Sequence, residues 1–597
     1  MRLEEHYLIL RVKYSVFSEC YPFNLTIHEV ADLLACSERN AKLIMKNMKE
    51  LGWITWEVFK GRGKKPLLTF LYSKSEMEHF LVKDLIQQGK YTEVIEKLNK
   101  YDLHIQEELE HFLEGYFGLS LEQEQNSQAE IDVLRCPIRQ KVKSIDPLKS
   151  LTRQEHEITQ HLFDSLFTFD YESQSIQPHI CFHWEHSEDG TEWFLYIRKG
   201  VYFHHGRCVD AHDVKFTIEH LSETNDYKDR NESVHYKEIT VINKYALKIT
   251  LNQPNYLLLN ELCSRRTSIL PKEWKEYVLE KNTPIGTGPY KVLKWSEERI
   301  ILVAHEHYFQ MRPHIDRIEL IYVNQNYQTD SLLFSYPDMY HEGAHWKPIY
   351  QTPNGASYLS INTSKPGIHN HPAIKKALYR IIWNCKNHAT DELTRPAYHF
   401  LYEQHSELGA GPPLYDTNMI EQLLTEADYQ GEVLNLVVPY VDIEKKKDPL
   451  VEKIISFCRV YGIHLEVQSM SISDLLMEQH RNTADIILVG VIVEEDIVLS
   501  LTRIFSSPLG FICNTMAEKE QQDLFSKLDQ ITTIPKREDQ LKAILAIEQH
   551  LIDSNKVLLI HHNTFQLFYN EKKSMEGINL FQTGGINYSK VWYKRRR

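Results

Sequence analysis

A short helix near the N-terminus, predicted over residues 37–51, has two chemically opposite faces. Apolar residues recur at steps of three and four, at Ala41, Ile44, Met48 and Leu51. Basic residues recur at the same steps, at Arg39, Lys42, Lys46 and Lys49. At about 100° per residue, the two stripes point about 160° apart. A helix that is buried on one side and cationic on the other suits the major groove of DNA.

The residues around this helix predict a winged helix-turn-helix domain. Thr26 and Glu29 have capping-box spacing and open a first helix, while Ser37 caps the second helix and Gly52 ends it. Two strand-like segments follow, at 53–59 and 67–72, and the turn between them is basic and contains two glycines. This order places the second helix in the major groove and the hairpin on the DNA backbone or in the minor groove.

Ten residues of this segment are the candidate DNA contacts: Ser37, Arg39, Asn40, Lys42, Lys46, Lys49, Lys60, Arg62, Lys64 and Lys65. The alternative is a solvated basic helix face beside an ordinary hairpin. The ordered combination of caps, turn, helix and basic tip favours DNA binding. Cations of the hairpin would bind phosphates in a salt-dependent way, whereas Arg39, Asn40 and Lys42 could reach base edges.

The charge of the chain is unevenly distributed. The net charge is −14, which argues against nucleic acid or an anionic membrane covering the whole molecule. Residues 1–100 hold 16 basic and 13 acidic residues, and the remainder hold 52 and 69. The 597 residues, 42% of them hydrophobic, are enough for two or more domains. We expect a DNA-binding domain with a helical extension over 1–115, a linker over 116–134 and a larger body over 135–597.

The N-terminus and the cysteines indicate a cytoplasmic location. Glu4, Glu5, Arg11 and Lys13 interrupt the stretch where a signal peptide would be apolar. The most apolar run, 486–493, is far shorter than the ~20 residues that span a bilayer, so we expect no membrane association. The nine cysteines are scattered without a CxxC pair. They predict reduced thiols rather than disulfides or a zinc site.

From about residue 131 the chain resembles the large bacterial extracytoplasmic solute-binding proteins, which include oligopeptide-, dipeptide- and nickel-binding components of transporters. The resemblance is carried by WFLYIRKGVYFHHGRCVDAHDVKFTIEHL (193–221), GTGPYKVLKW (286–295), YLSINTSKP (358–366) and HPAIKKAL (371–378). It implies an α/β body of the type II periplasmic-binding-protein kind, with two lobes and a ligand cleft between them. Most of the 193–221 block reads as turns and caps of the scaffold.

Two loops stand at the positions where the resemblance implies the cleft. One contains Tyr440 and Asp442, and the other contains Glu494, Glu495 and Asp496. Transporter-linked relatives usually have a tryptophan-rich stretch at the second loop, so the departure leaves the ligand class open. Three adjacent acids could bind a cation or an amine, or could form a solvated acidic loop.

A winged helix joined to a solute-binding body resembles the SgrR-type bacterial transcriptional regulators. The resemblance implies a protein that binds promoter DNA, takes a small solute such as a sugar, a sugar phosphate or a peptide, and is a possible homodimer. The alternative is the substrate-binding component of an ABC transport system with a basic N-terminal extension. We expect no enzyme, cofactor or metal, because the chain lacks a P-loop, HExxH and GxSxG, and its close histidine pairs have no ligand set at metal spacing.

Overall fold

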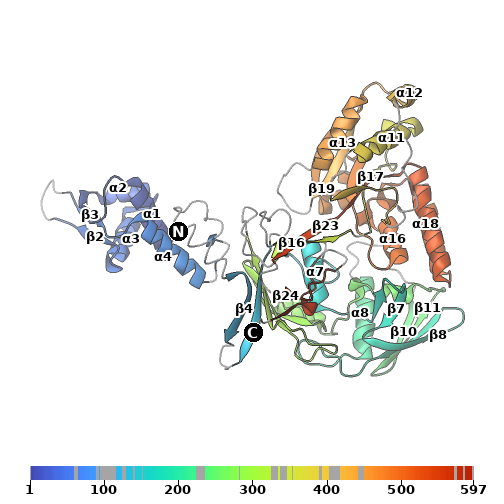
Figure 1. The fold of residues 1–597 in the computed structure, drawn as a ribbon, viewed down its shortest axis with the longest axis horizontal. Helices are drawn as coiled ribbons and strands as arrows, with labels where there is room; N and C mark the ends of the chain where they lie inside the picture. Colours follow the sequence, from blue (N-terminus) through green and yellow to red (C-terminus); the bar gives the residue numbers. More distant parts are fainter. Residues whose placement is uncertain are drawn as a thin grey trace. The chain divides into compact units, whose positions relative to one another are not determined.

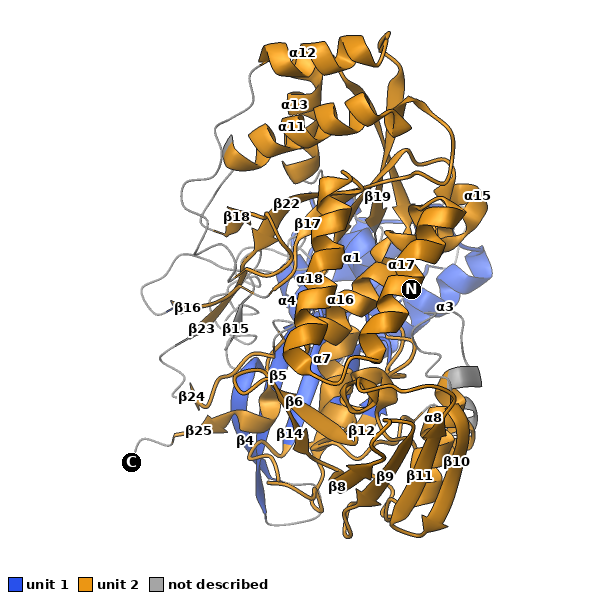
Figure 2. Cartoon of the chain, turned by 90° about the vertical axis from the view of Figure 1, so that its right-hand side faces the viewer, with its two compact units in different colours: residues 1–141, 294–301, 317–346 blue, residues 142–293, 302–316, 347–597 orange. Residues whose placement is uncertain are grey.

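The computed structural model describes residues 2–59, 65–88, 90, 93–94, 116–123, 129–138, 141–150, 152–223, 236–281, 283–323, 334–335, 346–352, 354–388, 393–402, 417–440, 449–570, 575–581 and 585–594. The chain divides into two compact units, which Figure 2 shows in blue and orange. Unit 1 comprises Met1–Lys141, Lys294–Ile301 and Arg317–Trp346, and unit 2 comprises Val142–Leu293, Leu302–Asp316 and Lys347–Arg597. No helix within the described ranges has the length and apolarity needed to cross a membrane.

The N-terminal part of unit 1 is a winged helix-turn-helix, as predicted (Figure 1). Its helices are α1 (Leu3–Lys13), α2 (Ile27–Leu33) and α3 (Glu38–Glu50). Its antiparallel sheet has the order β1-β3-β2, with β1 (Phe23–Asn24), β2 (Ile54–Glu57) and β3 (Leu67–Phe70). The hairpin pairs Ile54 with Phe70 and Glu57 with Leu67. The predicted turn tip, with Lys60, Arg62 and Lys64, lies outside the described residues.

Local side-chain contacts fix the ends of the two central helices of the head. The Thr26 hydroxyl accepts from the Glu29 amide at 3.3 Å, and the Glu29 carboxylate accepts from the Thr26 amide at 2.7 Å. Gly52, which follows α3, has φ 72°, where a side chain would be strained. The prediction of the buried stripe of α3 was wrong at one position: Leu51 is 57% exposed and Met45 is buried instead.

Helix α4 (Lys74–Gln87) belongs to two hydrophobic clusters within unit 1. Met77, in its first half, is buried in the cluster of the winged helix. Leu81, Val82 and Leu85, in its second half, pack with Phe117, Ile321 and Val323. These apolar positions join the head to the strands that follow it.

Those strands include most of the segment predicted as a linker. Residues 116–134 carry β4 (Gly118–Gln123) and the first half of β5 (Glu130–Ile138). Strand β5 pairs antiparallel with β4 and parallel with β14 (Arg317–Tyr322). Of the residues that pack with α4, Phe117 lies just before β4 and Ile321 lies within β14. Residues 95–115 lie outside the described part of the chain.

The first lobe of unit 2 is built on an antiparallel sheet of order β10-β11-β9-β8. Its strands are β8 (Cys181–His186), β9 (Glu192–Ile197), β10 (Tyr236–Asn243) and β11 (Ala246–Leu251), and α8 (Ala211–Glu223) packs on them. The 193–221 block spans β9, the turn and α8. Its turn is held by Arg207, which pairs with the fully buried Asp213 carboxylate at 2.6 Å.

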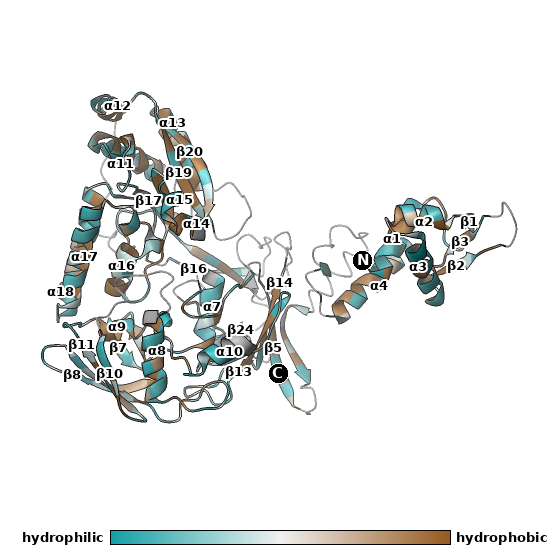
Figure 3. Ribbon diagram, turned by 180° about the vertical axis from the view of Figure 1, so that it is seen from behind, coloured by the Kyte–Doolittle hydropathy of each residue, from teal (hydrophilic) through white to brown (hydrophobic). Residues whose placement is uncertain are grey.

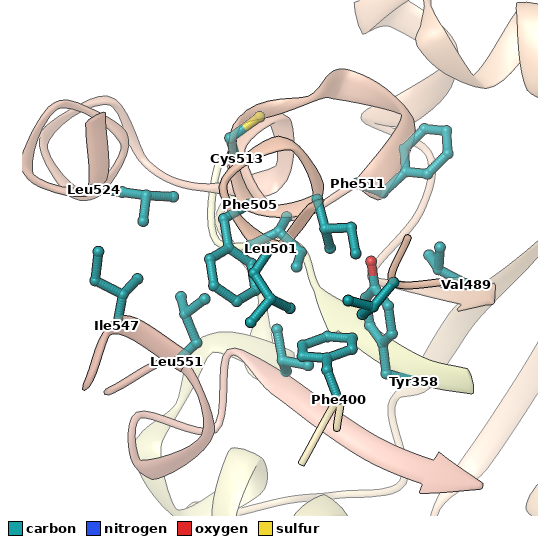
Figure 4. Packing of buried hydrophobic residues seen from close by; sticks show 14 of the residues in the cluster. Tyr358, Phe400, Val489, Leu501, Phe505, Phe511, Cys513, Leu524, Ile547 and Leu551 are labelled. Carbon is teal, nitrogen blue, oxygen red and sulfur yellow. The ribbon is translucent and has the colours of Figure 1, made fainter. Parts of the chain in front are cut away.

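The second lobe of unit 2 is a six-stranded mixed sheet of order β18-β22-β17-β21-β19-β20. Alternate residues of β21 (Ile486–Gly490) serve opposite faces. Ile486 and Leu488 pack with helices that include α11 (Pro372–His388) and α13 (Pro449–Val460). Ile487 and Val489 pack with α16 (Ile497–Ser506) and α18 (Arg537–Asp553), in the cluster that Figure 4 shows. The sheet is thus covered by helices on both faces.

The other elements complete this arrangement. The further strands of the second lobe's sheet are β17 (Ser357–Ile361), β18 (Thr394–Pro396), β19 (Val433–Tyr440), β20 (His464–Ser471) and β22 (Val557–Asn563). The remaining helices are α7 (Arg153–Leu162), α9 (Leu258–Glu261), α10 (Trp274–Lys281), α12 (Thr417–Glu426), α14 (Ile472–Leu476), α15 (Glu478–Arg481) and α17 (Glu518–Thr532). The remaining strands are β6 (Phe167–Asp170), β7 (Ser175–Pro178), β12 (Tyr290–Trp295), β13 (Arg299–Ala304), β15 (Phe334–Ser335), β16 (Trp346–Gln351), β23 (Phe565–Asn570), β24 (Met575–Glu576) and β25 (Trp592–Tyr593).

Candidate functional site

Helix α3 is largely hydrophilic, as its teal colour in Figure 3 shows, and its exposed residues include several cations. The predicted contacts on this helix are all exposed: Arg39, Asn40, Lys42, Lys46 and Lys49. Ser37 caps the helix by accepting from the Asn40 amide at 3.3 Å. The buried face of α3 packs into the head through Ala41, Ile44, Met45 and Met48. The structure thus presents the predicted cationic stripe to solvent.

The cations of this face differ in the hydrogen bonds and ion pairs that they make with the rest of the protein. The Lys49 ammonium donates to the Trp56 carbonyl of β2 at 3.2 Å, and Lys46 lies 3.6 Å from Glu50. Neither Arg39 nor Lys42 has an ion pair or a side-chain hydrogen bond within the described residues. Both are therefore free to meet a nucleic acid. Lys65 is exposed just before β3.

A second candidate site is a cavity of about 340 Å³ inside unit 2. It is lined by the first lobe through residues such as Asp164, Asn260 and Arg265. The second lobe contributes the predicted loop residues Glu494, Glu495 and Asp496, together with Arg503 of α16. The cavity thus carries charges of both signs and lies where the two lobes meet.

Asp496 is held by the protein from several sides. Its carboxylate caps α16 by accepting from the Leu499 amide at 3.0 Å. The same carboxylate accepts hydrogen bonds from the Asn260 amide group of the first lobe and from the Arg537 guanidinium of α18. Its side chain is 8% exposed. Asp496 therefore organises the loop and joins the lobes.

Glu494 lies among arginines. Burial alone would raise its pKa, but the positive charges of Arg265 and Arg503 outweigh burial and hold the pKa of this carboxyl below its usual range. The Arg503 guanidinium is 4.0 Å from the Glu494 carboxylate and donates to the Ser264 hydroxyl of the first lobe at 2.8 Å. The charge of Glu494 is thus balanced by cations of both lobes.

Glu495 and Arg265 are incompletely matched by protein groups. Burial, followed by the neighbouring charge of Glu494, raises the pKa of Glu495. Within the described residues this carboxylate has no ion pair or hydrogen bond from another side chain. Burial likewise lowers the pKa of Arg265, and its Nε atom is buried without a hydrogen-bond partner in the described part of the chain. Both groups line the cavity.

Other polar groups at the cavity serve the scaffold. The Asp164 carboxylate accepts from the Thr287 hydroxyl at 3.0 Å and the Tyr308 hydroxyl at 3.1 Å, and it lies 2.9 Å from Nε2 of His179. Among the described residues, no group of three histidine, cysteine, aspartate or glutamate side chains could hold a metal ion. The described lining of the cavity thus combines acidic and basic side chains with polar groups that hold the scaffold.

Among the described residues, only one of the two predicted ligand loops is found at the cavity. The acidic loop lines the cavity, whereas Tyr440 is the last residue of β19 and Asp442 lies outside the described residues. The sequence analysis missed Arg265 and Arg503. The adjacent pair Arg265 and Arg266, in an otherwise acidic body, was the only available signal, and it did not indicate that these cations face the acidic loop more than 200 residues later.

Two family descriptions match the sequence. Residues 2–119 match the sugar transport-related sRNA regulator N-terminal domain, and residues 175–496 match the middle region of the bacterial extracellular solute-binding proteins, family 5. The first match covers the winged helix and α4. The second includes most of both lobes and the acidic loop.

Similar sequences come from several bacteria. YhjP of Bacillus subtilis is 29% identical over the whole of both chains. The HTH-type transcriptional regulator SgrR of Salmonella typhi is 25% identical over 95% of both chains. SgrR of Escherichia coli K12 is 28% identical over 49% of this chain and half of its own length.

Solved structures share the fold of the body. DppA of Helicobacter pylori, in complex with the peptide STSA, aligns with a TM-score of 0.63 and 17% identity. NikA of Brucella suis, in complex with Fe(III)-EDTA, aligns with a TM-score of 0.62 and 17% identity. The alignments cover 78% and 77% of this chain but 98% and 100% of those proteins. The body therefore has the type II periplasmic-binding-protein fold, as predicted.

Proposed function

Because the chain belongs to the bacterial extracellular solute-binding proteins of family 5 and carries a regulator N-terminal domain, we propose that it is a ligand-responsive, DNA-binding transcriptional regulator. In this proposal the head binds promoter DNA and the cavity binds a small solute. The observation that carries the proposal is the free cationic face of α3 in the same chain as a charged cavity between two lobes.

The DNA-binding part rests on Arg39 and Lys42. Helix α3 is the second helix of the helix-turn-helix, which enters the major groove in proteins of this kind. Asn40 and Lys46 flank these cations on the exposed face. Lys65 and the hairpin residues Lys60, Arg62 and Lys64 are proposed to contact phosphates. Each lost phosphate contact reduces the dependence of affinity on salt concentration, because fewer counterions are released.

The test is DNA affinity measured over a series of salt concentrations, with the full chain and genomic DNA fragments. Arg39→Ala with Lys42→Ala is expected to weaken binding at least about tenfold and to reduce the salt slope by about two. The control is Lys536→Ala with Lys542→Ala, which removes the same charge from exposed positions of the body. Unchanged affinity and slope in the first variant would contradict the proposal.

We propose that the cavity takes a solute carrying a positively charged group and a negatively charged or carbonyl group. Glu495 would receive the first and the Arg265 guanidinium the second, since both face the cavity without complete protein partners. Glu494 and Asp496 would hold the loop and Arg503 in place. An amino-acid derivative or a short peptide has both groups, and 340 Å³ suits a small solute.

Thermal shift of the full chain against a panel of metabolites tests the cavity, because a solute that binds only the folded state raises the melting temperature. Glu495→Gln is expected to reduce the shift from an active solute by at least half. Glu518→Gln, at an exposed position of α17, is the control. A solute whose shift survives Glu495→Gln would contradict the assignment of this residue.

The lobes supply a route from the cavity to the head. A solute that binds both lobes stabilises their closed arrangement, and the equilibrium moves only by the difference in its affinity for the two states. The closed arrangement then favours or disfavours DNA binding, typically by 1–3 kcal/mol of coupling. A cytoplasmic location belongs to this proposal, since the head must reach DNA. A homodimer is a separate part of the proposal.

The alternative, a component of an ABC transport system, is less supported. The solved binding proteins align over nearly their whole length and leave about a fifth of this chain without a counterpart. The winged helix matches a regulator N-terminal domain. Cell fractionation tests the choice, because native protein recovered outside the cytoplasmic membrane would contradict the regulator. Catalysis is no part of the proposal, since the matched families are described by binding and regulation.

A further inference from the structure

Leu43 interrupts the polar face of α3. Its side chain is 54% exposed, although the helix has a complete buried face formed by four other residues. Single exposed leucines are common on protein surfaces. Leu43 is unusual because it lies within the cationic face.

Helical geometry places Leu43 in the middle of the outermost row of α3. At about 100° per residue, Arg39, Leu43 and Lys46 lie within about 60° of one another. This row points almost directly away from the buried residues Ala41, Ile44, Met45 and Met48. Asn40 and Asn47 flank the row on one side, and Lys42 and Lys49 flank it on the other. Leu43 is therefore the apolar centre of a polar and cationic surface.

The surroundings of Leu43 determine which partner suits it. An apolar protein surface would bring the adjacent cations of α3 out of water without compensation. A DNA duplex suits both the cations and the leucine. Its phosphates pair with the flanking cations, and its major groove exposes the 5-methyl group of thymine. That methyl is the one apolar group on the base edges of the groove.

We propose that Leu43 contacts the 5-methyl group of a thymine in the operator and so contributes to sequence recognition. This inference rests on the proposed DNA-binding function. The cations that meet phosphates would supply affinity for any duplex, whereas Leu43 would make one base pair preferable to the others.

The test uses duplexes selected from a random library by the full chain. Each thymine of a selected duplex is then replaced by deoxyuridine, which lacks only the methyl group. For the native chain, one such replacement is expected to weaken binding about fourfold, the effect of one buried methyl group. For Leu43→Ala, the same replacement is expected to have no effect.

Leu51→Ala is the matched control, because Leu51 is also an exposed leucine, 57% exposed, but lies just past the end of α3, eight residues after Leu43. It is expected to bind like the native chain. If Leu43→Ala keeps the full deoxyuridine effect, or if no replacement affects the native chain while it still binds DNA, the role of Leu43 is overturned and DNA binding stands. If the native chain selects no duplex, the proposed function itself fails. A change of oligomeric state in Leu43→Ala, with DNA binding unaltered, would also overturn the inference.

Discussion

At the residue scale, the three consecutive acids of the cavity have different environments. Asp496 caps α16 and contacts Asn260 and Arg537, and Glu494 is balanced by arginines. Within the described residues, Glu495 has no ion pair or hydrogen bond from another side chain. Chemically similar side chains thus separate into a structural acid and a candidate ligand-binding acid. We therefore expect substitution of Asp496 to affect mainly the free energy of unfolding, and substitution of Glu495 to affect mainly ligand binding.

We predict that Asp496→Ala lowers the free energy of unfolding by about 2–4 kcal/mol, because it removes a helix cap and leaves two polar groups of other elements without their acceptor. Glu495→Gln is expected to stay within about 0.5 kcal/mol of the native value or to exceed it, since burial disfavours its charge. Urea unfolding measures both. A larger loss for Glu495→Gln than for Asp496→Ala would contradict this division.

Lys386 gives a prediction for pH dependence. Its ammonium is buried, donates to the Ala397 carbonyl at 2.7 Å, and lies over the rings of Trp383 and Tyr398. Burial lowers its pKa from 10.5 to about 7. Between these values the unfolded chain binds the proton and the folded chain does not. The free energy of unfolding therefore rises with pH across this window, and the cost of burying the charged lysine is fully present below pH 7.

Lys386→Met removes this contribution. From pH 7.5 to 9, native stability is expected to gain up to about 1.4 kcal/mol per pH unit relative to the variant. Denaturant unfolding at several pH values measures the difference, and other titrating groups cancel in the comparison. Lys556, whose pKa burial also lowers to about 7, remains in both proteins. Parallel pH profiles for the two proteins would show that Lys386 stays charged when folded.

At the element scale, α4 is the helix whose two halves serve different clusters. Leu85 is fully buried against the cluster of Phe117 and Ile321, and Met77 is fully buried in the winged helix. We predict that Leu85→Ala leaves DNA affinity nearly unchanged but reduces its response to the solute, because the contact between the head and the following strands is weakened.

Met77→Ala is the matched substitution in the same helix. It is expected to destabilise the winged helix by about 2–5 kcal/mol and to weaken DNA binding directly. Filter binding with and without an active solute distinguishes the two variants. Equal losses of affinity in both would indicate that α4 belongs to the head alone.

The head could be predicted from local sequence because its signals are local. Thr26, Glu29, Ser37 and Gly52 act within four residues of themselves, and the paired strands β2 and β3 are close in the sequence. The exception, Leu51, shows the limit of periodicity: a residue just past the last turn follows the chain reversal rather than the helix.

The cavity could be predicted only in part. The acidic loop was found because it follows a long apolar strand at a position implied by the resemblance. Arg265 and Arg503 come from different lobes, and their approach to Glu494 depends on the tertiary arrangement of both. The prediction of a linker over residues 116–134 missed the strands in this segment for the same reason. Polar residues of β4 are ordered by pairing with β5, which local composition does not reveal.

At the scale of the whole molecule, the distribution of charge determines how the two sites can be coupled. Residues 1–100 carry a small positive excess, and the rest of the chain carries a large negative one. DNA is therefore repelled by the body and attracted by a small face of the head. A solute site in the body can influence that face only through the fold.

Reciprocity follows from this coupling. If a solute changes the affinity for DNA by a given factor, saturating DNA must change the affinity for the solute by the same factor. Calorimetric titration of the solute, with and without a selected duplex, measures one factor, and DNA titration with and without solute measures the other. Equal factors are expected, in the range of 5- to 150-fold. A solute that binds tightly but gives a factor of one would show that the cavity does not regulate the head.

The double membership of α4 has a consequence for chimeric proteins. Exchanging the DNA-binding region of this chain for that of a relative at a boundary before Lys74 would leave the transplanted domain without Met77 in its core. Cutting after Gln87 would supply that core but bring foreign side chains against Phe117, Ile321 and Val323. A working exchange of specificity therefore needs a hybrid helix, with its first half taken from the donor of the head and its second half kept from the recipient.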